Sequence, residues 1–193
     1  MIINNLKQKE NQMRKPYKSS VFTIFMFCLL SIFLLGEKSG ICHEWSEIKV
    51  RLLPDSSFAL VEIEEGQKIR HSPHHDANGK LDAEQLIYVL GTFDDEIWVD
   101  QTNRKSARKH LINHYDQFIT RVREKGLQPG SVNINQAKLT KLVALPQIGP
   151  VLAVKIAEYR NSGTSFTSIE DIKKVEGIGA ATFNAIKFYI NVD

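Results

Sequence analysis

Cysteine is scarce in this chain of 193 residues, which has only Cys28 and Cys42. Cys28 lies inside an apolar run near the N-terminus and would be removed with a cleaved leader. Cys42 would then be the only cysteine left, so an internal disulfide is excluded for the rest of the chain. We expect Cys42 to be a free thiol or to pair with another molecule.

Glycine and proline are too few, at 11 and 6 residues, for a collagen-like or wholly disordered chain. Hydrophobic residues make up 42% of the sequence and charged residues 24%, as is usual for chains that fold around a core. The length allows one or two small domains.

The folded part of the chain also lacks an excess of positive charge. The formal net charge is +3, but residues 1–40 contribute +4 and the remainder sums to −1. Residues 131–193 carry +2. The overall charge is therefore no evidence for nucleic-acid binding, and any such function must be argued from motifs.

The N-terminus has the pattern of a targeting segment. Basic residues precede an uncharged run of sixteen residues from Val21 to Gly36. This run is short for a membrane-spanning helix, which needs about 20 residues, but it suits a signal peptide or a tight signal-anchor. We expect residues 1–42 to export the protein to the periplasm or another extracytoplasmic site. An uncleaved segment would make the membrane a partner. Lipidation of Cys42 is an alternative.

Residues 43–128 predict a small α+β domain of unknown role. Alternating apolar residues indicate strands, and Glu65-Gly66 indicates a turn between two of them. From Asp82, a helix cap with Gln85 three residues later, the apolar spacing becomes helical. The predicted strands are 48–52, 58–63 and 67–71, and the predicted long helix is 103–125.

The last sixty residues contain a repeat with a period of 30, in which Ile148-Gly149 matches Ile178-Gly179. Each unit is expected to be a helix, a tight turn and a second helix. Asn135 and Ser168 are placed to cap the first helix of each unit. The predicted helices are 136–145, 150–160, 169–175 and 180–191.

The turns of this repeat are the expected ligand-binding sites. Gly177 and Gly179 flank one apolar residue, which can enter the core while the glycines leave the backbone accessible. Backbone amides at the start of a helix can bind phosphate oxygens. A tight turn between helices also favours glycine, but two matching turns favour the functional interpretation.

Val132–Ala137, Leu145–Pro150 and Val175–Gly179 resemble the tandem helix-hairpin-helix domain of ComEA-type proteins. The resemblance covers residues 131–193 and implies a two-repeat all-α domain there. With the small α+β domain predicted before it, the expected fold is mainly α. It also implies binding of double-stranded DNA through phosphates. In the first hairpin, Gln147 replaces a usual glycine, so weaker binding is expected if the backbone there needs a positive φ. The DNA-binding residues that the resemblance implies are Gln147, Ile148, Gly149, Val151, Lys155, Gly177, Ile178, Gly179, Ala180 and Lys187.

Histidines offer a competing site in the middle of the chain. His74 and His75 are expected in a loop, and His110 and His114 lie one turn apart on a helix, an arrangement that could hold zinc. Unliganded surface histidines explain the same pattern, so no metal or cofactor is assigned. The segment from Asp76 to Asp82 is interpreted as an Asn-Gly turn, because a calcium loop would need carboxylates at His74 and Gln85.

The sequence contains no recognisable catalytic arrangement, so an enzyme is not expected. The leading hypothesis is an exported, sequence-independent DNA-binding protein that acts in DNA capture or uptake. One alternative is a non-enzymatic interaction module with a protein partner in the cell envelope. Another is a metal-dependent nuclease that uses the histidines.

Overall fold

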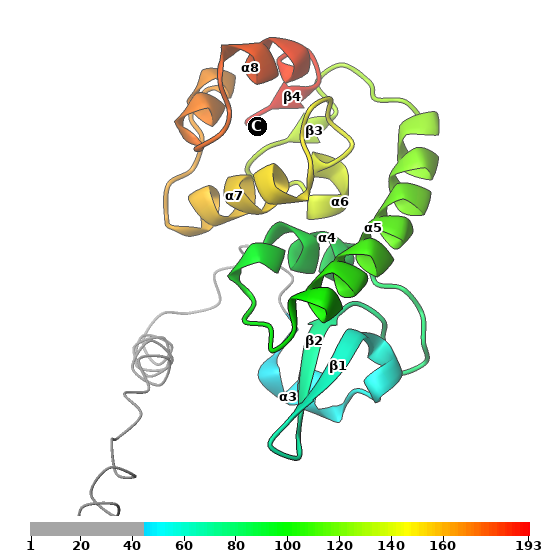
Figure 1. Cartoon of the computed structure of the whole chain (residues 1–193). Coiled ribbons are helices and arrows are strands. Elements are labelled where there is room, and N and C mark those ends of the chain that lie inside the picture. Colours follow the sequence, from blue (N-terminus) through cyan, green and yellow to red (C-terminus); the bar gives the residue numbers. More distant parts are fainter. Residues whose placement is uncertain (1–44) are drawn as a thin grey trace, which may run out of the picture. The chain divides into compact units, whose positions relative to one another are not determined.

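The computed structural model describes residues 45–193 (Figure 1). The predicted signal segment at 1–42, with Cys28 and Cys42, lies outside these residues. The described residues belong to one compact unit. Among them, no helix combines the length and the apolar character that a membrane crossing requires.

The described chain begins with a short helix where a strand was predicted. Helix α3 spans Glu47–Leu52, so the strand prediction for 48–52 is wrong. The hydroxyl of Ser46 caps the helix by accepting the N–H of Lys49, and the side chains of Glu47 and Arg51 pair one turn apart. These local polar contacts favour a helix. Helix α3 has no buried residue, so no alternation of buried and exposed side chains favours a strand.

A β-hairpin follows, as the sequence predicts. After the 3₁₀ turn η1 (Asp55–Ser57), strands β1 (Phe58–Glu64) and β2 (Gln67–Pro73) pair antiparallel. Glu65 and Gly66 have φ angles of 48° and 80°. Positive φ at both central residues is typical of a type I′ turn, whose twist matches that of the two strands of a hairpin.

Two helices pack against this hairpin. Helix α4 (Ala83–Gly91) begins where Asp82 accepts the N–H of Gln85 at 3.1 Å, which confirms the predicted cap. The turn η2 (Phe93–Asp95) leads to α5 (Gln101–Glu124), within two residues of the predicted long helix. Its buried face is formed by Ala107, Leu111 and Ile119, which lie at helical spacing.

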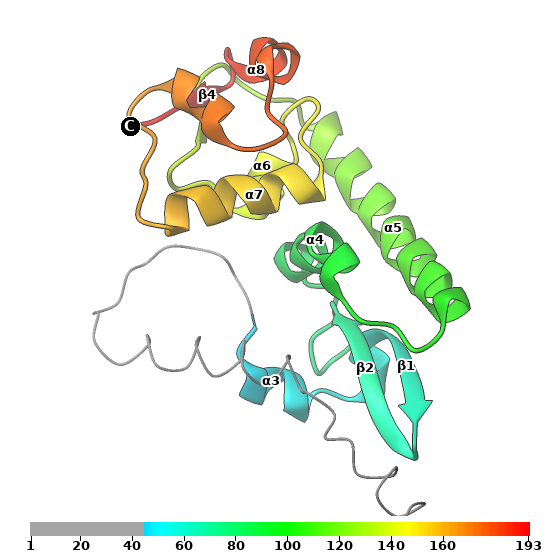
Figure 2. The ribbon, with the colours of Figure 1, turned by 60° about the vertical axis from the view of Figure 1, so that its left-hand side comes forward.

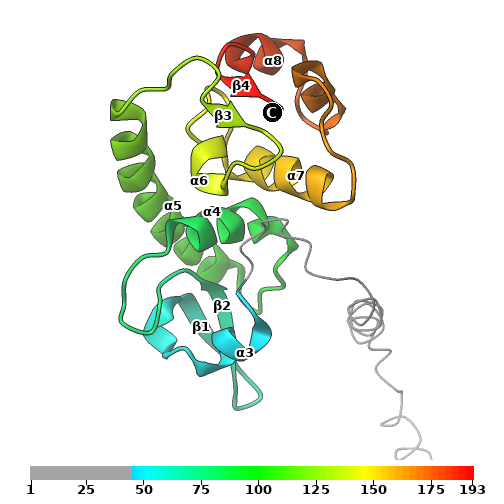
Figure 3. The same ribbon diagram turned by 180° about the vertical axis from the view of Figure 1, so that it is seen from behind.

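The C-terminal region is helical except for two short strands that close it (Figure 3). Strands β3 (Val132–Asn133) and β4 (Ile190–Asn191) pair in parallel, which joins the two ends of the repeat. Between them lie α6 (Leu139–Leu142), α7 (Pro150–Asn161), η3 (Ile169–Lys174) and α8 (Ala180–Ile186). The described chain is thus mainly α with a small α+β region, as predicted.

Two of the predicted helices in the repeat are too long. The helix predicted at 136–145 is only α6, and the helix predicted at 180–191 ends at Ile186. Asn135 is not a helix cap; its amide bonds Phe166 and Val192 instead. Ser168, in contrast, forms the predicted capping box with Asp171.

Helix α4, which belongs to the predicted α+β domain, packs against α7 and α6 of the repeat (Figure 2). Its Glu84 carboxylate accepts the N–H groups of Leu139 at 2.9 Å and Thr140 at 3.1 Å, and so caps α6. A Cβ on Gly91 would lie 2.5 Å from the side chain of Val154 in α7. The close approach of these helices therefore requires glycine at this position.

Candidate nucleic-acid interface

The two hairpins of the repeat use the same turn. The N–H of Ile148 donates to the carbonyl of Leu145 at 3.2 Å, and the N–H of Ile178 donates to Val175 at 3.0 Å. All four side chains are buried. Each hairpin thus fixes its turn by inserting two apolar side chains into one shared core.

The residue before each inserted isoleucine has a positive φ, 61° at Gln147 and 92° at Gly177. The first hairpin therefore does hold Gln147 at a positive φ, which is the condition under which the sequence predicts weaker binding there. A side chain in this conformation costs about 1–2 kcal/mol. At Gly177 the positive φ favours glycine, and a Cβ would also lie 2.8 Å from the end of the Leu152 side chain, which would have to move.

Gly149 and Gly179 are required neither by conformation nor by internal packing. They are the N-caps of α7 and α8, with φ angles of −99° and −90° that any residue adopts. A Cβ at either position would meet no atom of residues 45–193 within 4 Å. These glycines leave the surface of each turn uncovered by a side chain, next to the exposed residues Val151 and Ala180. An external group can therefore approach the backbone closely at both turns.

The two turns lie side by side. Leu152, in the first turn of α7, is the side chain that approaches Gly177 in the second hairpin. Lys155 of α7 also pairs with Glu176 of the second turn, at 3.2 Å between Nζ and Oε2. One ligand with regularly spaced charges could therefore contact both hairpins.

The two lysines that the resemblance implies lie in different settings. Lys155 borders the second turn, where it offsets the exposed charge of Glu176. Lys187 is the C-cap of α8, at the opposite end of that helix from Gly179, and lies over the ring of Phe188. Lys141 and Lys173, exposed on the helices before the two turns, were missed by the sequence reasoning. Their positions a few residues before the turns could have identified them as basic residues close to the expected phosphate sites.

The single arginine of the repeat has a structural role. Arg160 is buried and donates to the carbonyls of Ile134 at 3.0 Å and Ala137 at 2.7 Å. These contacts join the end of α7 to the loop before α6. Its charge is therefore directed inward, and the exposed lysines carry the positive charge of this surface.

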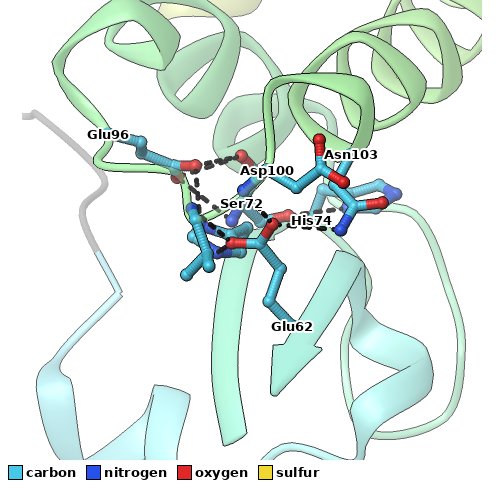
Figure 4. Close-up of polar contacts among 8 residues, drawn as sticks. Glu62, Ser72, His74, Glu96, Asp100 and Asn103 are labelled. Atoms are coloured by element: carbon cyan, nitrogen blue, oxygen red, sulfur yellow. Dashed lines mark hydrogen bonds and ion pairs between the residues drawn. The ribbon is translucent and has the colours of Figure 1, made fainter. Parts of the chain in front are cut away.

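A buried polar network lies in the β-hairpin region, away from these turns (Figure 4). Glu62 accepts N–H groups from Val99 at 2.9 Å, Asp100 at 3.0 Å and Asn103 at 3.1 Å, and it contacts His71 at 2.9 Å. Burial alone would raise the pKa of Glu62, but these donors lower it to about 2. The network ties β1 to the start of α5.

The structure brings the four candidate histidines together. His74 follows β2 and is fully buried, His75 and His114 are partly buried, and His110 is exposed. Burial lowers the pKa of His74 to about 3, and it lowers the pKa of His75 and His110 as well. His74, His75 and His114 could offer nitrogens to one metal ion. The Asp76 loop is the predicted Asn-Gly turn, in which the Asp76 carboxylate accepts N–H groups from Asn78 and Lys80.

The helix-hairpin-helix motif family matches residues 128–191. This segment is a helix-hairpin-helix region. The match covers both turns and confirms the fold that the resemblance implied.

Curated relatives share only part of the chain. ComE operon protein 1 of Bacillus subtilis (strain 168) is 42% identical over 71 residues, which are 37% of this chain and 35% of that protein. Endonuclease/exonuclease/phosphatase family domain-containing protein 1 is 39% identical in Xenopus laevis and 38% in Homo sapiens. Each of these two matches covers 32% of this chain and 11% of the relative. The chain thus spans about a third or less of these relatives' length. No solved structure matches it.

Proposed function

We propose that the protein binds double-stranded DNA without sequence preference, through phosphates at the two hairpin turns. The observation that carries this proposal is the pair of N-cap glycines, Gly149 and Gly179. Nothing in the described part of the chain requires glycine at either position, yet both keep the backbone accessible from outside. The motif match and the similarity to ComE operon protein 1 support the same activity.

Phosphates are the part of DNA that such turns can bind. Backbone N–H groups at a helix start carry partial positive charge and have no partner within the helix. They contact phosphate oxygens but read no base, so they position the protein without giving sequence specificity. The two turns are not equivalent, because Pro150 lacks an N–H and Gln147 adds a side chain to the first one.

The charge of the repeat sets the expected strength of binding. Residues 131–193 carry a net charge of only +2, so each molecule releases few counterions and binds weakly, with a Kd on the order of micromolar. Several copies on one duplex would raise the overall affinity through avidity. Affinity should fall as the salt concentration rises, because the contacts are electrostatic.

The N-terminal segment extends this proposal to a location and a role. We propose that residues 1–42 export the protein, so that its DNA-binding region captures DNA in the periplasm or elsewhere outside the cytoplasm. An uncleaved segment would anchor the protein in the membrane, and an envelope protein could receive the DNA in uptake. A reporter fused after Asp193 should be active only outside the cytoplasm, and cytoplasmic activity would contradict the export proposal.

A gel-shift assay with and without EDTA tests the DNA-binding proposal. Binding without cleavage, equal in both conditions, is the expected result. Absence of binding at any salt concentration would refute the proposal and favour the protein-interaction module. Cleavage that EDTA abolishes would favour a nuclease that uses the histidines.

A further inference from the structure

Four imidazoles join the loop after β2 to the face of α5. Loop residues His74 and His75 meet His110 and His114, which lie one turn apart on the helix. We propose that His74, His75 and His114 bind one divalent transition-metal ion, Zn²⁺, and that His110, beside His74, supplies a fourth ligand. The site is separate from the hairpins and does not depend on the DNA-binding proposal.

The spacing of the nitrogens is close to that of a zinc site. Ligand nitrogens of His74, His75 and His114 all lie within 4.8 Å of one another. Nε2 of His74 lies 3.0 Å from Nε2 of His110. Tetrahedral zinc with Zn–N distances of 2.0–2.1 Å places its nitrogens about 3.3 Å apart. Small side-chain rotations would therefore close the group around one ion.

The buried member of the group is oriented as a metal ligand. Nδ1 of His74 is 3.0 Å from the carbonyl of Ser72, and a carbonyl can only accept, so Nδ1 carries the proton. Nε2 then presents a lone pair to the cluster. A metal-binding histidine is commonly fixed in this way by a hydrogen bond from its other nitrogen. His110 donates to this lone pair in the metal-free protein and would move that proton to its own Nδ1 when an ion binds.

The backbone holds the loop in place for this role. The carbonyl of Ser57 accepts the N–H groups of His74 at 2.9 Å and His75 at 3.2 Å. Oδ1 of Asp76 accepts the Asn78 and Lys80 amides, and the three residues whose ligand atoms converge are all histidines. Imidazole suits Zn²⁺ and its transition-metal neighbours, whereas Mg²⁺ and Ca²⁺ prefer oxygen ligands.

Titration of the purified full-length chain with Zn²⁺, against a chromophoric competing chelator, tests the proposal. We expect one ion per chain. A ligand that binds only the folded protein stabilises it, so Zn²⁺ at 100 times its Kd should raise Tm by about 5–10 °C. Co²⁺ should give the visible absorption of a tetrahedral site.

The decisive variant is H75Q/H114Q, and its matched control is N113Q, an exposed position on the same helix. The double variant should lose the ion, the Tm shift and the Co²⁺ spectrum, and N113Q should keep all three. If the double variant loses its helical circular dichroism, H75Q alone replaces it, because that side chain is partly exposed. Failure of the unmodified chain to bind, or equal binding by variant and control, would overturn the proposal.

Discussion

Replacing Gly179 with aspartate should strengthen the fold and weaken DNA binding at once. Gly179 is an N-cap with a φ of −90° and open space around its Cβ. Aspartate is a favoured N-cap, so G179D should stabilise the protein by a few tenths of a kcal/mol. The same carboxylate would occupy the amides that the phosphate needs.

The loss of affinity can be sized from Coulomb's law. A carboxylate about 5 Å from a phosphate repels it by about 1–3 kcal/mol for effective dielectric constants between 80 and 20. That energy corresponds to an affinity about 5 to 150 times weaker. Added salt should reduce the difference between variant and unmodified protein, because it screens exposed charges.

Three variants make the interpretation specific. G179N caps the helix without the charge and should lose less affinity than G179D. T164D adds the same charge at an exposed loop position that belongs to neither turn and should bind DNA normally. G149D tests the first hairpin, where a smaller loss is expected because Pro150 has already removed one amide. Fluorescence anisotropy on a labelled duplex and urea unfolding measure the two effects. A G179D variant that is stable and binds with unchanged affinity would refute the reasoning.

Other predictions follow from the same contacts. Q147G should stabilise the protein by about 0.5–1 kcal/mol in urea unfolding, since relief of the strained φ exceeds the entropy cost of glycine; a loss of stability would contradict the assigned turn. E84A should cost about 1–3 kcal/mol by removing the cap of α6, and an unchanged midpoint would show that water replaces it. N135A should cost a similar amount, checked by the same assay. Because the pKa of Glu62 is lowered to about 2, its contribution to the free energy of unfolding is complete above about pH 4.5 and is lost as pH falls towards 2. E62Q should reduce this loss of stability between pH 4.5 and 2.

The tandem hairpins were predictable because their signal is local and repeated. Apolar residues at a period of 30 marked the inserted side chains, and the glycines marked the turns. Gln147 broke the pattern, and only the structure shows that its φ is positive like that of Gly177. The sequence alone could not weigh that strain against the packing of Ile148 beside it.

The errors arose where distant contacts decide local structure. The chain after Ile186 leaves its helix to pair with β3, a contact between segments almost sixty residues apart. The cap of α6 comes from Glu84, a residue outside the repeat. At α3 the alternation of Ile48 and Val50 resembled a strand, but neither side chain is buried. The helix cap at Ser46 therefore decides the local structure. The histidines were visible in the sequence, yet only the packing of the β2–α4 loop on α5 brings them together.

The central claim is that exposed hairpin backbones bind DNA phosphates without reading sequence. Anisotropy titrations of the full-length chain with two unrelated duplexes, over a series of salt concentrations, test it most directly. The account predicts equal affinities for both duplexes and a logarithm of affinity that falls linearly with the logarithm of salt concentration. A strong preference for one duplex, or an affinity that does not respond to salt, would contradict it.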